Sequence, residues 1–131
     1  MSIKRAAVKD VMSMPIISIK TNETAEDAID KLKSKNIHKA IILNPKDETI
    51  GYTDIWKLGL LDQKMKIEDT LKNEDLIYSK TFSVNQNTPL KEVMPKLLEK
   101  DILVVTNDAG DKIGVITPQD VRKVKEKEFI L

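Results

Sequence analysis

Apolar and polar positions along the chain follow two kinds of pattern, and both kinds occur twice in the same order. Apolar residues recur at helical spacing over 24–35 and again over 88–100, with polar residues between them. A largely apolar stretch follows each segment, at 40–43 and at 103–106, and such stretches are typical of buried strands. The pattern therefore predicts an amphipathic helix followed by a buried strand in each half of the chain.

The stretches around each helix and strand also correspond. The letters IGYTDIWKL at 50–58 align with IGVITPQDV at 113–121, and both read as a second strand that runs into a closing helix. In the first copy we expect a leading helix at 8–12, a short β segment at 15–19, the amphipathic helix at 24–35, the buried strand at 40–43, a second strand at 49–53 and a closing helix at 54–63. In the second copy we expect the same six elements, in the same order, at 67–71, 81–84, 88–100, 103–106, 112–116 and 118–127.

The repetition indicates two tandem copies of one β-α-β-β-α unit in an α/β fold. We expect the first copy at 1–63 and the second at 67–131, each of about 60 residues. A unit of this size buries only a modest core by itself. We therefore expect the two copies to form one module.

Composition narrows the class of protein. The chain has 131 residues, of which 40% are hydrophobic and 33% charged, and its net charge is +1. These values are typical of a soluble folded protein. No apolar run approaches the roughly 20 residues that span a membrane, and no signal peptide is recognisable, so we expect a cytoplasmic protein without membrane contact. The balanced charge and the 4% of aromatic residues argue against nucleic-acid binding.

The same composition gives no support for catalysis or for a metal site. The chain has no cysteine and one histidine, which excludes disulfides, thiolate nucleophiles and the usual zinc sites. It also lacks a Gly-rich phosphate loop and a nucleophile elbow. We therefore expect no catalytic residue, no metal ligand and no tightly bound cofactor, and we do not expect an enzyme.

The phrase Thr117-Pro118-Gln119-Asp120 carries the most distinctive polar pattern, and it has two interpretations. In the first it only starts a helix: Thr117 is the N-cap, Pro118 is the first helical residue, and the Asp120 carboxylate returns to the N-cap amide. In the second it also binds a ligand, because a carboxylate can accept two hydrogen bonds from a cis-diol and a helix N-terminus attracts phosphate. The local sequence leaves both interpretations open.

The first copy keeps the helix start but lacks the second acceptor. Asp54 stands where Thr117 stands in the second copy, and Lys57 stands where Asp120 stands. Asp54 is a competent N-cap, whereas the ammonium group of Lys57 only donates hydrogen bonds. We therefore expect the copies to differ as ligand sites, with a ligand that carries a cis-diol preferring the one that Asp120 lines.

The ordered set of these segments, present twice, resembles a stand-alone pair of CBS domains, also called a Bateman module. The segments that carry the resemblance are VKDVM at 8–12, the helix Thr24–Leu32, NIHKAIIL at 36–43, IGYTDIW at 50–56, TPLKEVM at 88–94 and IGVITPQDV at 113–121. The resemblance implies two repeats related by a pseudo-twofold axis, association into a homodimer, and clefts that hold adenosine-containing molecules such as AMP, ADP, ATP or S-adenosylmethionine. Members of this family usually act as sensors or regulatory modules.

The resemblance also implies roles for individual residues. Asp120 would accept the ribose hydroxyls, and Thr117 would reach the ribose or the α-phosphate. The other residues implied are Gly114 and Ile116 in the same phrase, Thr81, Ile102, Leu103 and Val104 for the adenine, and His38 and Lys39 for the phosphates. The alternative for the last pair is an ordinary polar pair ahead of a strand. We expect Trp56 to pack against the other repeat or a second chain.

Three functional hypotheses follow. The first is a sensor that binds an adenine nucleotide or S-adenosylmethionine in the cleft lined by the second copy and signals to an unknown effector protein. The second is a ligand-independent module for homo-oligomerisation or protein interaction, in which Thr117 and Asp120 only cap a helix. The third, a weaker one, is nucleic-acid binding through a local lysine patch.

Overall fold

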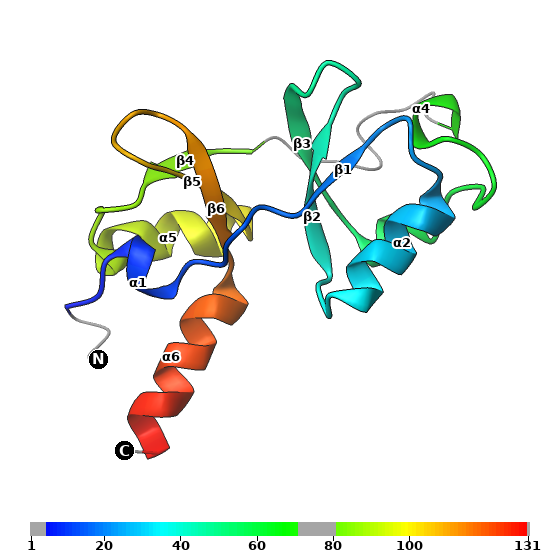
Figure 1. The fold of residues 1–131 in the computed structure, drawn as a ribbon. Helices are drawn as coiled ribbons and strands as arrows, with labels where there is room; N and C mark the ends of the chain where they lie inside the picture. Colours follow the sequence, from blue (N-terminus) through cyan, green and yellow to red (C-terminus); the bar gives the residue numbers. More distant parts are fainter. Residues whose placement is uncertain (1–4, 71–80, 131) are drawn as a thin grey trace. The chain divides into compact units, whose positions relative to one another are not determined.

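The computed structural model describes residues 5–70 and 81–130, and the chain divides into two compact units (Figure 1). The first-copy unit is Ile17–Lys80, and the second-copy unit is Met1–Ile16 together with Thr81–Leu131. Each unit contains a three-stranded sheet and helices. The chain therefore has the mixed α/β fold that the sequence predicts.

The two units repeat the same sheet. The elements of the first-copy unit are β1 (Ser18–Lys20), α2 (Ala25–Ser34), β2 (Lys39–Leu43), β3 (Thr49–Asp54), α3 (Ile55–Leu58) and α4 (Ile67–Thr70). Those of the second-copy unit are α1 (Val8–Val11), β4 (Ser83–Asn85), α5 (Leu90–Lys100), β5 (Leu103–Thr106), β6 (Lys112–Ile116) and α6 (Pro118–Ile130). In both sheets the first strand runs parallel to the second and the second antiparallel to the third. The internal repeat is thus confirmed in strand order and direction.

The starts of the two long helices follow from their capping residues. The Thr24 hydroxyl accepts a hydrogen bond from the Asp27 amide at 3.1 Å, as its sequence position predicts. In the second copy Pro89 is the N-cap and Leu90 the first helical residue, so the helix starts two positions later than the predicted range 88–100. The reason is the Leu90 amide, which donates to the Ala6 carbonyl at 2.9 Å and so pairs a helix-start N–H group.

The closing helix of the first copy is shorter than predicted. The apolar pattern suggested 54–63, but α3 ends at Leu58, with Gly59 as its C-cap. The Gln63 side chain donates to the carbonyl oxygens of Leu58 and Leu61 at 3.0 Å and 2.8 Å. Because these bonds satisfy carbonyl groups that a longer helix would use, the chain can turn away here.

Each leading helix packs against the sheet of the other copy. The amide of Val8 in α1 donates to the Thr88 carbonyl at 2.9 Å, and the amide of Ile67 in α4 donates to the Glu23 carbonyl at 2.9 Å. Both apolar side chains are fully buried. Helices of four residues are not stable alone, so burial in the other copy's core holds them. Each compact unit therefore contains the leading helix of the other sequence copy. The boundaries of the copies along the sequence, at 63 and 67, stay a prediction.

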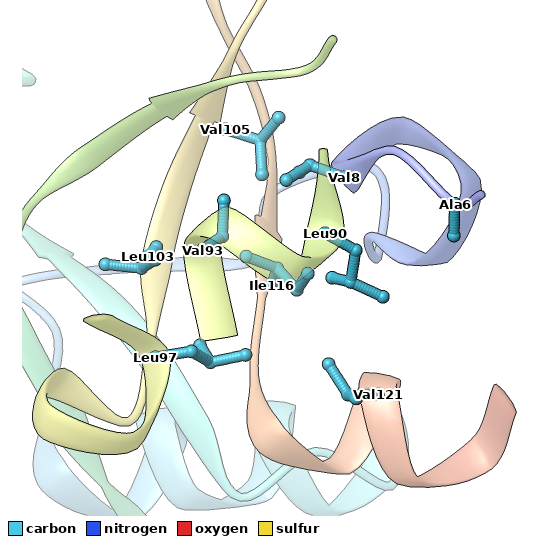
Figure 2. Packing of buried hydrophobic residues seen from close by; sticks show 9 residues of the cluster. All are labelled: Ala6, Val8, Leu90, Val93, Leu97, Leu103, Val105, Ile116 and Val121. Carbon is cyan, nitrogen blue, oxygen red and sulfur yellow. The ribbon is translucent and has the colours of Figure 1, made fainter. Parts of the chain in front are cut away.

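Each unit has its own hydrophobic core. Figure 2 shows the second-copy core, where side chains from the sheet, α5 and α6 meet those of the leading segment. Its buried members are Ala6, Val8, Leu90, Val93, Leu97, Leu103, Val105, Ile116 and Val121. The first-copy core contains Ile19, Ala25, Ala28, Leu32, Ala40, Ile42, Leu58 and Ile67.

Candidate functional site

The junction of β6 and α6 places the two most distinctive polar side chains together. The Asp120 Oδ2 atom accepts the Thr117 amide at 2.9 Å and the Thr117 hydroxyl at 3.2 Å. The Asp120 amide in turn donates to the Thr117 carbonyl at 3.1 Å. The predicted return of Asp120 to the N-cap amide is therefore confirmed, and the carboxylate stabilises the start of α6.

Ser13 is a partner of Asp120 that the sequence reasoning missed. The Ser13 hydroxyl donates to Asp120 Oδ1 at 2.8 Å, and Asp120 is only 8% exposed. The main chain of Ser13 also forms an antiparallel bridge with Val115 on β6, with N–H···O distances of 2.8 Å and 3.0 Å. The leading segment of the chain thus reaches the candidate site through one side chain and two backbone hydrogen bonds.

Gly114 explains how the leading segment can approach so closely. A Cβ atom at this position would lie 2.6 Å from the Ser13 carbonyl oxygen and 3.0 Å from Cγ of Met14. Only glycine therefore allows this approach without movement of the backbone. Ile116, the other implied residue of the phrase, is fully buried and belongs to the second-copy core.

The residues implied for the adenine do not share one environment. Leu103 belongs to the second-copy core, whereas Ile102 and Val104 are each 1% exposed and lie outside that cluster. The Val104 amide donates to the Phe82 carbonyl at 2.8 Å and is therefore already paired. Thr81 is half-buried and directly precedes Phe82. An adenine edge would have to pair with other groups than the Val104 amide.

Two lysines next to this strand were also missed. The ammonium groups of Lys96 and Lys100 on α5 lie 4.4 Å and 4.5 Å from the centre of the Phe82 ring. Their four-residue spacing puts them on one face of the helix, which could have drawn attention to them. Both cations are within cation–π distance of the ring. Lys100 also lies 3.5 Å from the Glu99 carboxylate, which offsets its charge, so Lys96 contributes more of the positive charge beside Thr81.

The equivalent end of β3 in the first-copy unit is chemically different. Asp54 caps α3 by accepting the Lys57 amide at 2.8 Å, and Lys39 faces Asp54 across the strand pair. The exposed rings of His38 and Trp56 meet edge-on, with centroids 5.3 Å apart. Trp56 is 62% exposed. His38, Lys39 and Trp56 thus all belong to the first-copy unit, whereas the other implied residues belong to the second-copy unit.

Other site types find no support in the part of the chain that the structure describes. No group of three or more His, Cys, Asp or Glu residues there could hold a metal ion. No helix in the described ranges is both long enough and apolar enough to cross a membrane. The β6–α6 junction is therefore the strongest candidate site for a ligand.

Comparison with known sequences identifies one recurring domain. The profile of the CBS domain matches residues 8–55 and again 74–127. The chain is 25% identical over 126 residues to protein MK0525 of Methanopyrus kandleri, covering 94% of this chain and 64% of that protein. It is 32% identical over 126 residues to protein MJ1004 of Methanocaldococcus jannaschii, covering 93% of this chain and 58% of that protein. The chain thus spans less than two thirds of these relatives.

Solved structures share the fold at low sequence identity. The CBS domain pair of protein MJ0100, in complex with 5′-methylthioadenosine and S-adenosyl-L-methionine, superposes with a TM-score of 0.71 at 20% identity, over 95% of this chain and 98% of that chain. A hemolysin-like protein containing a CBS domain, from Oenococcus oeni, gives a TM-score of 0.73 at 22% identity, over 92% and 90% of the two chains. The chain therefore shares the fold of known CBS-domain structures.

Proposed function

Because this chain belongs to the CBS-domain family and carries the domain twice, we propose that it is a non-catalytic regulatory module that binds an adenosine-containing ligand at the β6–α6 junction. AMP, ADP, ATP and S-adenosylmethionine are the candidates. The CBS pair of protein MJ0100 carries 5′-methylthioadenosine and S-adenosyl-L-methionine, which supports an adenosine-containing compound over other ligands.

The observation that carries the proposal is the Asp120 carboxylate at the start of α6. It lies beside the Thr117 hydroxyl, at 3.2 Å, so an acceptor for ribose hydroxyls and a second polar group stand at one helix N-terminus. Carboxylates suit cis-diols because they accept two hydrogen bonds. In the first-copy unit Lys57 holds the equivalent place, and a lysine offers no acceptor.

The remaining contacts of the ligand are proposed with it. Ile102 and Val104 are each 1% exposed, so an adenine would contact them only by displacing the groups that cover them. Thr81 would offer a hydroxyl, and Lys96 adds positive charge close to it. We also propose that His38 and Lys39 neutralise phosphate groups. His38 is exposed and its ring contacts that of Trp56.

Thermal unfolding in the presence of AMP, ATP or S-adenosylmethionine tests this proposal. A ligand at about 100 times its Kd adds about 2.7 kcal/mol to the free energy of unfolding. The variant Asp120→Ala should lose this stabilisation. The matched control is Asp54→Ala, which removes the equivalent helix cap of the first copy and should keep it. No stabilisation of the wild-type protein by any of the three compounds would overturn the proposal, as would full stabilisation of Asp120→Ala.

A homodimer is proposed as the second part of the function, and one feature of the surface supports it. An apolar groove of about 210 Å³ lies between α5 and α6, and Leu98 on its rim is 75% exposed. Its lining residues are Met94, Leu97, Leu98, Pro118, Val121 and Arg122. An exposed leucine on the rim of an apolar groove supports association through this face. If no ligand binds, this groove makes a ligand-independent oligomerisation module the alternative function.

The cellular compartment and an effector protein are the last parts of the proposal. The described residues include no cysteine, which fits a reducing compartment such as the cytoplasm. A regulatory module needs a partner that reads its state, so we propose an effector protein that senses the ligand-bound arrangement of the chain. Binding can shift that arrangement only if the ligand has different affinities for two arrangements.

A further inference from the structure

We infer that Ser13 competes with the ribose for Asp120, so that a cis-diol must displace the Ser13 hydroxyl in order to bind. The inference rests on the proposed function of the β6–α6 junction. It concerns a residue at the opposite end of the sequence from Asp120, 107 positions away.

The first step is a count of the hydrogen bonds that Asp120 accepts. A carboxylate has about four acceptor positions. Among the residues that the structure describes, three donors fill three of them: the Ser13 hydroxyl at 2.8 Å, the Thr117 amide at 2.9 Å and the Thr117 hydroxyl at 3.2 Å. A cis-diol brings two further donors. One resident donor must therefore leave before both ribose hydroxyls can bind.

The second step identifies the donor that leaves. The Thr117 amide is fixed in the backbone at the start of α6, and the Thr117 hydroxyl shares Oδ2 with it. Among the described residues, the Ser13 hydroxyl is the sole donor to Asp120 Oδ1, and Ser13 is an exposed residue. Because of this exposure, its hydroxyl can exchange the bond to Asp120 for one to water at low cost. Ser13 is therefore the donor that a ribose displaces.

The third step connects this exchange to the rest of the unit. Ser13 pairs with Val115 through two backbone hydrogen bonds, and it follows α1, whose Val8 side chain is fully buried in the second-copy core. Loss of the side-chain bond leaves the leading segment attached to β6 by the backbone bridge alone. Ribose binding thus acts directly on the leading segment, which gives the module a route to report its ligand.

The experiment compares wild-type protein with Ser13→Ala, using AMP and 2′-deoxy-AMP as probes in calorimetric titrations, and ATP with 2′-deoxy-ATP as a second pair. Ser13→Ala should bind AMP or ATP about three- to tenfold more tightly, since the free state loses a hydrogen bond that the ribose no longer has to break. A 2′-deoxy nucleotide brings one hydroxyl, which fits the fourth acceptor position. Its affinity should stay within about twofold of wild type.

Three further measurements separate competition from a merely structural role. Without ligand, Ser13→Ala should unfold at a lower temperature than wild type although it binds AMP more tightly, a combination that general loosening does not produce. Ser13→Thr keeps the hydroxyl and should restore the wild-type affinity. The last measurement uses wild-type protein, so it does not depend on whether a variant folds. The NMR signal of the Ser13 amide should shift on addition of AMP and shift much less on addition of 2′-deoxy-AMP.

The outcomes distinguish this inference from the proposed function. Unchanged or weaker binding of AMP and ATP by Ser13→Ala, or equal gains for the ribo and deoxy forms, would overturn the role of Ser13 and leave the adenosine site standing. If wild-type protein and Ser13→Ala both bind none of AMP, ATP and S-adenosylmethionine, the proposed function fails and the inference fails with it. If S-adenosylmethionine alone binds, the same gain is expected for it, and its absence overturns the inference.

Discussion

Thr53 on β3 and Ile116 on β6 occupy equivalent positions in the two sheets, and both residues are fully buried. Thr53 faces Ala40 across its strand pair, as Ile116 faces Leu103. The Thr53 hydroxyl, however, has no hydrogen-bond partner among the residues that the structure describes. A buried hydroxyl without a partner destabilises the folded state.

Replacement of Thr53 by the isosteric valine should therefore stabilise the protein. We expect Thr53→Val to raise the free energy of unfolding by about 1 kcal/mol, measured by urea denaturation. The matched control is Thr21→Val, since Thr21 is also buried but donates to Glu68 at 3.3 Å. That change should lower the free energy of unfolding by about 1 kcal/mol. A loss of stability in both variants would contradict our interpretation of Thr53.

Gly114→Ala should destabilise the second-copy unit. The added Cβ would lie 2.6 Å from the Ser13 carbonyl oxygen, so the backbone of one segment must move. Overpacking of this kind costs roughly 1–3 kcal/mol, and urea denaturation measures it. Gly110→Ala serves as the control, because its Cβ meets no atom within 4 Å and only its φ of +85° causes strain. Equal stability of Gly114→Ala and wild type would show that Ser13 is not held against β6.

The local features of the candidate site could be predicted because they join residues close in sequence. The caps formed by Thr24 and Asp54, and the bond from the Thr117 amide to Asp120, each connect residues three positions apart. Capping depends on side-chain type at such short spacings. The order of helices and strands was equally accessible, because hydrophobic periodicity is a local property and the repeat displays it twice.

The remaining features depend on contacts between distant segments. The bond from Ser13 to Asp120 spans 107 positions, and it exists because the leading helices are exchanged between the copies. The sequence of a four-residue helix does not show which of the two hydrophobic cores will bury it. The apolar run at 102–104 likewise gave no indication that Leu103 alone faces the core cluster, since a continuous run does not reveal which face of a strand is which.

Leu98→Glu should convert the proposed homodimer to a monomer. Leu98 is 75% exposed on the rim of the groove between α5 and α6, so a charge there should change the free energy of unfolding of one chain by less than about 0.5 kcal/mol. Buried at a dimer interface, the same charge would lack a partner and oppose association. Light scattering coupled to size-exclusion chromatography measures the mass. Leu60→Glu is the control, because Leu60 is 85% exposed and does not line the groove. A monomeric wild-type protein would rule out the dimer.

Asp120→Asn should cost more stability than Asp54→Asn, although both changes conserve shape. At an N-cap such as Asp54, asparagine accepts the same amide bond as aspartate, so the cost should be a few tenths of a kcal/mol. Asp120 instead accepts hydrogen bonds on both oxygens, from Ser13 and from Thr117, and an asparagine keeps only one uncharged acceptor oxygen, so it loses the charge-assisted bonds to at least one of these partners. We expect a loss of about 1–3 kcal/mol in urea denaturation and at least about tenfold weaker AMP binding. Equal losses for the two variants would mean that the Ser13 and Thr117 bonds contribute nothing beyond a helix cap.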